Sequence, residues 1–206
     1  MINPIEVGRL LRGATTGFVV GCRVSQLDAP SLGALVRVPQ AGAYDIFGII
    51  HDIHIDDDGL VRQLVTADGV DESIIQDNRV NRNVPLEISV LAVGYSLNGH
   101  IFHLLPPRPP LSLDLIYKCS ANEICDFTSA GHFGYFRHIL RSADLPVGEI
   151  LAAHLQQAQE AHAAAGRAEW GQQAAQELIT LLRDDYATLM AVLGALADTG
   201  ILEEGR

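Results

Sequence analysis

The stretch YDIFGIIHDIHIDDDG, residues 44–59, is rich in isoleucine and closes on three aspartates and a glycine. β-Branched and aromatic residues are typical of a strand, and an Asp-Gly run is typical of a turn. The stretch therefore predicts a strand over residues 44–55, the longest that the chain offers. It also holds two histidines and four aspartates within eight positions, so it must be weighed as a ligand site too.

Similar apolar runs, separated by Gly, Pro and Asp, recur at spacings of about ten residues through the first half of the chain. They predict further strands over residues 18–24, 32–39, 61–67, 84–96 and 100–106. Asn98-Gly99 between the last two is a strong signal for a tight β-hairpin. Five or six short antiparallel strands without intervening helices predict a small closed barrel.

The period changes after PPRPP, residues 106–110, a stiff extended stretch that we interpret as a domain boundary. Beyond it, a short helix is predicted over 134–142 and two long helices over 149–166 and 168–198. A short turn at Gly166 would join the long helices into a hairpin. The predicted fold class is α+β, with an antiparallel β-barrel over residues 1–110 and an α-helical domain over 111–206.

The first half of the chain resembles the HAS-barrel, the small β-barrel at the N-terminus of HerA-type ATPases and of F-type ATP synthase catalytic chains. The resemblance rests on VGRLLRGATTGFVVGCRV (7–24), PSLGALVRVP (30–39), IFGIIHDIHI (46–55), NRVNRNVPLEISVLAVGY (78–95) and the proline-rich exit. It implies a barrel that forms contacts between subunits and docks accessory partners. HerA-type proteins continue into a P-loop ATPase, but Lys118 is the only lysine here, and the residues directly before it (DLIY, 114–117) contain no glycine. The resemblance therefore implies a barrel without its ATPase domain.

Composition argues against several classes of protein, namely nucleic-acid-binding, membrane-spanning and secreted ones. The formal net charge is −11 and neither half of the chain is basic, so nucleic-acid binding is not favoured. No run approaches the 18 apolar residues of a membrane span, and the N-terminus lacks a signal peptide's apolar core. Three cysteines, an odd number, fit a reducing compartment, so we expect a cytoplasmic protein.

Two sets of side chains could bind a metal. Asp52, His54 and Asp56 share one face of an extended strand, whereas His51 falls on the opposite, apolar face with Phe47, Ile49, Ile53 and Ile55. The set could hold a divalent ion, but a solvated strand face is the favoured interpretation. Cys119, Cys125, His132 and His138 follow at intervals of six, seven and six; the His pair just fits the H-x3-5-H spacing of zinc sites, and the Cys pair does not fit C-x2-4-C. No metal or other cofactor is predicted.

We found no G-x-S-x-G elbow and no cysteine-protease signature, so a non-enzymatic assembly or adaptor protein is predicted. It would contact protein partners, including copies of itself in a homo-oligomer, through the helical hairpin and through barrel loops at 28–32 and 77–83. The candidate contact residues are Arg79, Arg82, Trp170, Leu178, Leu189 and Leu193. Two alternatives stay open: an accessory factor of an HerA-like DNA-processing system that touches DNA through Arg79 and Arg82, and a metal-binding protein or hydrolase using the Asp52/His54/Asp56 face.

Overall fold

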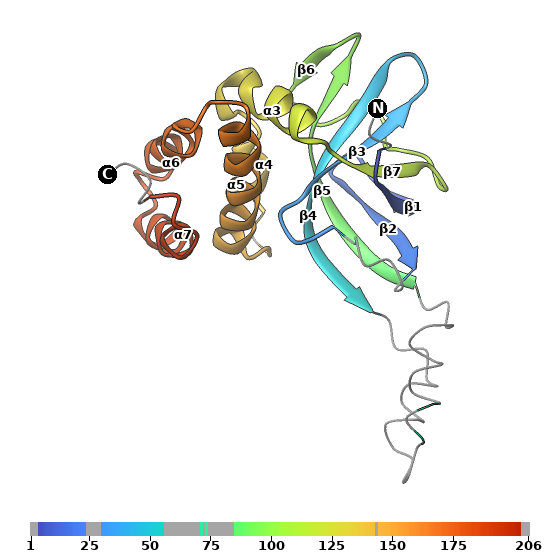
Figure 1. Cartoon of the computed structure of the whole chain (residues 1–206). Coiled ribbons are helices and arrows are strands. Elements are labelled where there is room, and N and C mark those ends of the chain that lie inside the picture. Colours follow the sequence, from blue (N-terminus) through green and yellow to red (C-terminus); the bar gives the residue numbers. More distant parts are fainter. Residues whose placement is uncertain are drawn as a thin grey trace.

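The computed structural model describes residues 4–23, 30–55, 71, 73, 85–142 and 144–202. An antiparallel β-barrel comes first in the chain, and a group of helices packs against one side of it (Figure 1). The predicted α+β class is confirmed. Within the described ranges, no helix has both the length and the apolar character needed to cross a bilayer.

The barrel closes with six strands, and a seventh extends it. The strands are β1 (Glu6–Gly13), β2 (Gly17–Arg23), β3 (Leu35–Gln40), β4 (Tyr44–Ile55), β5 (Pro85–Leu97), β6 (His100–Phe102) and β7 (Leu115–Lys118). Their order is β2-β1-β7-β3-β4-β5-β6, and pairing of β2 with β5 closes the ring. The predicted hairpin at Asn98-Gly99 is confirmed, since Leu97 pairs with His100 and both turn residues have positive φ.

The sheet extends past the boundary expected at residue 110. Strand β7 pairs with both β1 and β3, so it completes the barrel from the far side of the proline-rich stretch. Pro106 and Pro110 are buried, and the carbonyl of Pro110 lies close to Gly13. The stiff stretch therefore carries the chain from β6 to a non-adjacent strand of the same barrel. The strand predicted over 61–67 lies outside the described residues.

The helices are α3 (Ala121–Ser129), the 3₁₀ turn η1 (Ala130–Phe133), α4 (Phe136–Leu140), α5 (Val147–Ala164), α6 (Trp170–Leu181) and α7 (Tyr186–Asp198). The prediction of one helix over 168–198 was wrong, because the helix is interrupted between the end of α6 at Leu181 and the start of α7 at Tyr186. Asp185 caps α7 by accepting a hydrogen bond from the Thr188 N–H at 3.1 Å. The α6 and α7 helices both contact α5, so the second arm of the predicted hairpin is bent.

Strand β4 is buried on both faces over its first half. Ile46 and Ile50 fill the barrel interior together with side chains from the other barrel strands. Phe47 and Ile49 point the other way and belong to the core formed with the helices. The barrel and the helices therefore share β4 as a common wall, and each side of it buries apolar surface.

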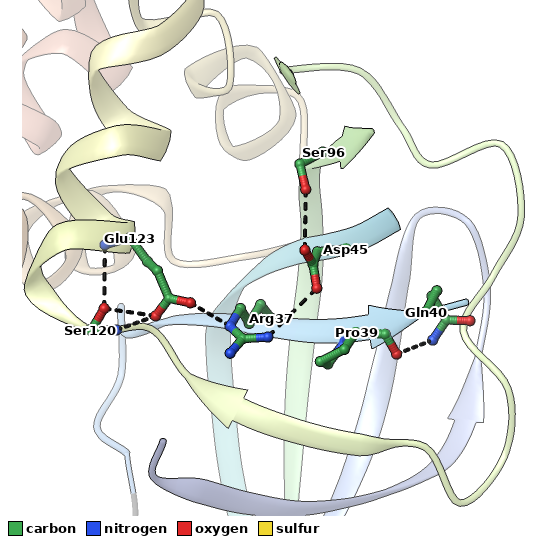
Figure 2. A network of polar contacts seen from close by, with 7 residues as sticks. All are labelled: Arg37, Pro39, Gln40, Asp45, Ser96, Ser120 and Glu123. Atoms are coloured by element: carbon green, nitrogen blue, oxygen red, sulfur yellow. Dashed lines mark hydrogen bonds and ion pairs between the residues drawn. The ribbon is translucent and has the colours of Figure 1, made fainter. Parts of the chain in front are cut away.

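Two sets of contacts join the helices to the barrel. On α5, the buried His154 bonds through Nδ1 to the Gly33 carbonyl at 2.9 Å, and the Gln157 side chain donates to the Leu32 carbonyl at 2.9 Å. At the start of α3, Glu123 pairs with Arg37 of β3 at 2.6 Å (Figure 2). Glu123 also completes a capping box with Ser120, so one carboxylate both starts the helix and ties it to the barrel.

Replacing Gly33 by alanine should separate conformational strain from the contact with α5. Gly33 has φ +78°, and a Cβ there would lie 2.5 Å from the His154 backbone nitrogen. We expect Gly33→Ala to lower the free energy of unfolding by about 3 kcal/mol, because left-handed strain and overpacking add together. Gly42→Ala is the matched control: φ is also +78° but nothing lies within 4 Å. It should cost only about 1 kcal/mol in urea unfolding. Equal losses of unfolding free energy in the two variants would contradict the close packing of α5 on Gly33.

Candidate functional site

The predicted Asp/His face is only partly assembled. The register of β4 on β5 shifts between Ile50 and Asp52, and both Ile50 and Ile53 pack into the barrel. The two residues between them, His51 and Asp52, therefore both lie on the outer side, and the prediction that His51 faces away from Asp52 was wrong. A β-bulge inserts one extra residue, and a hydrophobic pattern does not reveal it.

His54 lies beside Asp52, with 3.4 Å between Nδ1 and the carboxylate, and 3.9 Å from the Glu87 carboxylate on β5. Arg12 in turn pairs with Glu87 at 3.1 Å. Asp56, the third member of the predicted set, lies outside the described residues. Across the described part of the chain, no group of three or more His, Cys, Asp or Glu side chains could hold a metal ion. In the described part of this face, two carboxylates, an imidazole and a guanidinium lie side by side on the barrel wall.

The Cys/His set is not brought together. Cys119 and Cys125 are buried free thiols, and burial raises the pKa of Cys119 well above its ordinary value. His132 is 83% exposed on η1, and His138 bonds through Nε2 to the His103 carbonyl at 3.1 Å. Buried neutral thiols are poor nucleophiles, so Cys119 has a packing role.

The predicted contact residues divide into two groups. Trp170 and Leu178 are buried in the core between α5 and α6, and Leu189 packs against that core from α7. Leu193 is half-buried. Arg79 and Arg82 lie outside the described residues, as do most of the two predicted barrel loops. The exposed large apolar side chains of the helical arm are different ones: Ile179, Leu181, Tyr186, Met190 and Leu202.

A groove runs along the first half of α6, and we call it the α6 groove. It consists of two overlapping cavities, of about 310 Å³ and 440 Å³, which share His132, Phe133 and Gln173. The first cavity is completed by Thr128, Ser129, Arg167, Glu169 and Trp170, and the second by Gln172, Gln176 and Glu177. One wall is the η1 turn with the end of α3, and the other is α6.

The η1 wall has an unusual backbone. Gly131, His132 and Phe133 have φ values of 53°, 48° and 57°, so two non-glycine residues in succession are left-handed. Such residues cost about 1–3 kcal/mol each and persist where the surroundings hold them. Two contacts hold this turn against α6: His132 lies 3.8 Å from the Glu177 carboxylate, and the Phe133 ring lies 5.7 Å from Trp170.

The floor of the groove rests on His162 of α5, which is fully buried and stacks parallel on Trp170 at 4.4 Å. Its Nε2 lies 2.7 Å from the Thr128 hydroxyl, which is also 2.7 Å from the Ile124 carbonyl. The hydroxyl has one proton and a carbonyl can only accept, so Thr128 donates to Ile124 and accepts from His162. His162 therefore carries a proton on Nε2, and burial, which lowers its pKa to about 4, keeps the ring neutral near pH 7.

A second buried residue of α5 fixes where α6 begins. The side-chain amide of Gln159 donates to the Ala168 carbonyl at 2.7 Å, and its oxygen accepts from the Gly171 N–H at 2.7 Å. A Cβ on Gly171 would lie 2.8 Å from that oxygen. The first turn of α6, and with it the groove wall, is therefore positioned by α5.

Comparison with protein-family models finds no match, and a search of curated proteins finds no match either. The α6 groove was not predicted, although its sequence holds a signal for it. Gln172, Gln173 and Gln176 place three amides on the part of the helix that follows Trp170. The left-handed turn opposite them depends on tertiary packing. The groove thus presents neutral amides, aromatic rings and charged side chains of both signs to a potential ligand.

The two fully buried histidines of α5 should make stability depend on pH. Burial lowers the pKa of His154 and of His162 from 6.5 to about 4. Between these values the unfolded chain binds more protons than the folded one, so stability is complete above about pH 6.5 and falls towards pH 4. Each histidine should contribute up to about 3 kcal/mol to that loss.

The variant that checks this is His162→Phe, which keeps a ring on Trp170 but cannot titrate. We expect its deficit against the native protein to shrink by about 2 kcal/mol between pH 7.5 and pH 4.5 in urea unfolding. Ala158→Gly, at a buried position of the same helix, has no titrating group and should cost the same at both pH values. A constant deficit for His162→Phe would show that folding does not lower the pKa of His162.

Proposed function

We propose that this protein is a non-enzymatic assembly or adaptor protein that works by contacts with other protein chains. The observation that carries the proposal is the outer face of α7. Tyr186 is 73% exposed and Met190 is 49% exposed, and residues four apart lie on one face of a helix. Exposed apolar side chains gathered on one face are typical of a contact surface.

Packing of the opposite face of α7 supports this role. Val192 and Leu196 are fully buried against α5, and a Cβ on Gly148 of α5 would lie 3.2 Å from the Ala191 carbonyl. The close approach holds α7 firmly in place, so Tyr186 and Met190 are presented by a fixed helix. A rigid surface loses little conformational entropy on binding.

The first partner that we propose is a second copy of the chain. A helix face that meets itself about a two-fold axis needs no other component, and two-fold dimers are the commonest oligomers. The closed barrel would then be free for further partners, in keeping with the resemblance of the first half of the chain to the HAS-barrel. We place this assembly in the cytoplasm, where three buried free thiols would stay reduced.

Light scattering coupled to size-exclusion chromatography tests the self-association. We expect a dimer or larger oligomer for the native chain, and a monomer for Tyr186→Glu combined with Met190→Glu. Two carboxylates buried against apolar surface would oppose association, at a cost of several kcal/mol. Gln156→Glu, on the exposed face of α5, adds one carboxylate elsewhere and should leave the oligomer intact. A native chain that stays monomeric at high concentration would overturn the self-association.

A further inference from the structure

We propose that the α6 groove binds an extended peptide segment of a partner protein, held by its main chain against the glutamines of α6. This inference rests on the proposed protein-binding role, but it uses a different helix from Tyr186 and Met190. The occupant is identified by three features of the groove: the pitch of its amides, its charge and its aromatic wall.

The amide pitch matches an extended chain. Gln172 and Gln176 are four residues apart on α6, which places them about 6 Å apart along the axis. In an extended peptide, main-chain groups that face the same way recur every two residues, about 6.6 Å apart. Each glutamine amide offers one acceptor and two donors, which is the complement of a peptide C=O and N–H. Two successive outward-facing peptide units could therefore pair with the two glutamines.

These amides are free to do so. Gln172, Gln173 and Gln176 are exposed, and their side chains form no hydrogen bond with another described residue. Gln157 and Gln159 of α5 differ, because both are committed to carbonyls of the chain itself. The glutamine side chains of α6 therefore line the groove without a hydrogen-bond partner among the described residues.

The charge of the groove favours a neutral main chain over an anion. At one end, Arg167 donates to the Ser129 hydroxyl at 3.0 Å, and Glu169 lines the same cavity with the opposite charge. In the second cavity, Glu177 lies beside His132, which both cavities share. The middle of the groove holds uncharged amides. A phosphate or nucleic-acid backbone would find no cluster of cations here.

The aromatic wall supplies the apolar part of the contact. Phe133 is half-buried, and its ring packs on Phe136 at 5.3 Å and on Trp170 at 5.7 Å. Phe133 reaches this position because its own backbone and that of His132 are left-handed. Backbone strain of this kind gathers at ligand-binding positions, where the surrounding structure maintains it.

Panning of a phage-displayed library of random linear peptides on the full chain tests the proposal. Enriched sequences are synthesised and titrated against the native protein, the double variant Gln172→Ala with Gln176→Ala, and the control Gln156→Ala on α5. We expect the double variant to bind at least about tenfold more weakly, since two hydrogen bonds of ordinary strength are lost. The control should bind within about twofold of the native affinity. Circular dichroism melting should show both variants folded, because all three glutamines are exposed.

An N-methyl scan of one such peptide separates main-chain pairing from side-chain contacts. Methylation removes one peptide N–H at a time, so affinity should fall at alternate positions and stay level at those between. A uniform response, failure to enrich any peptide, or equal binding to the double variant would overturn the proposal. So would binding of a saccharide, from a glycan array, that the double variant abolishes. None of these outcomes bears on Tyr186 and Met190, so self-association of the chain is tested independently.

Discussion

The close contact between α5 and Gly33 determines how the helices sit on the barrel. The backbone of α5 comes so near that a Cβ on Gly33 would lie 2.5 Å from the nitrogen of His154. At the same point the His154 ring links two parts of the fold, since Nδ1 donates to the Gly33 carbonyl and Nε2 accepts from the Tyr135 hydroxyl at 3.1 Å. A carbonyl can only accept, so Nδ1 carries a proton, and burial, which lowers the pKa of His154 to about 4, keeps the ring neutral near pH 7. The contact thus sets the position of α5 and the tautomer of its histidine.

Much of the remaining structure depends on that helix. The α3, α4, α6 and α7 helices all contact α5, and its buried Gln159 and His162 set the start of α6 and the floor of the groove. The contact of Arg37 on β3 with Glu123 at the start of α3 is a second attachment of the helices to the barrel (Figure 2). Arg37 is also 3.6 Å from Asp45 of β4, so it bridges two carboxylates on different elements. The two attachments together fix the angle between the helices and the barrel.

The sequence was a good guide wherever a local pattern decided the structure. The strands at 18–24 and 44–55, the Asn98-Gly99 hairpin and the α5 helix all follow from side-chain pattern and turn chemistry. Features that depend on distant partners were missed. β7 is only four residues long and is a strand because β1 and β3 lie beside it. The bulge at His51 and the left-handed turn at His132 are likewise set by packing, and Trp170 was assigned to a surface although α5 covers it.

The break between α6 and α7 has a consequence for binding. On one uninterrupted helix, Gln172 and Tyr186 would be fourteen residues apart and would fall within about 40° of the same face. The same holds for Gln176 and Met190, so free amides and exposed apolar side chains would have shared one stripe. Asp185 ends that continuity by capping a new helix, and α6 and α7 take different directions on α5 (Figure 1). The polar groove and the apolar face therefore need not compete for the same side of one rod, and a single helical arm can offer two chemically distinct surfaces.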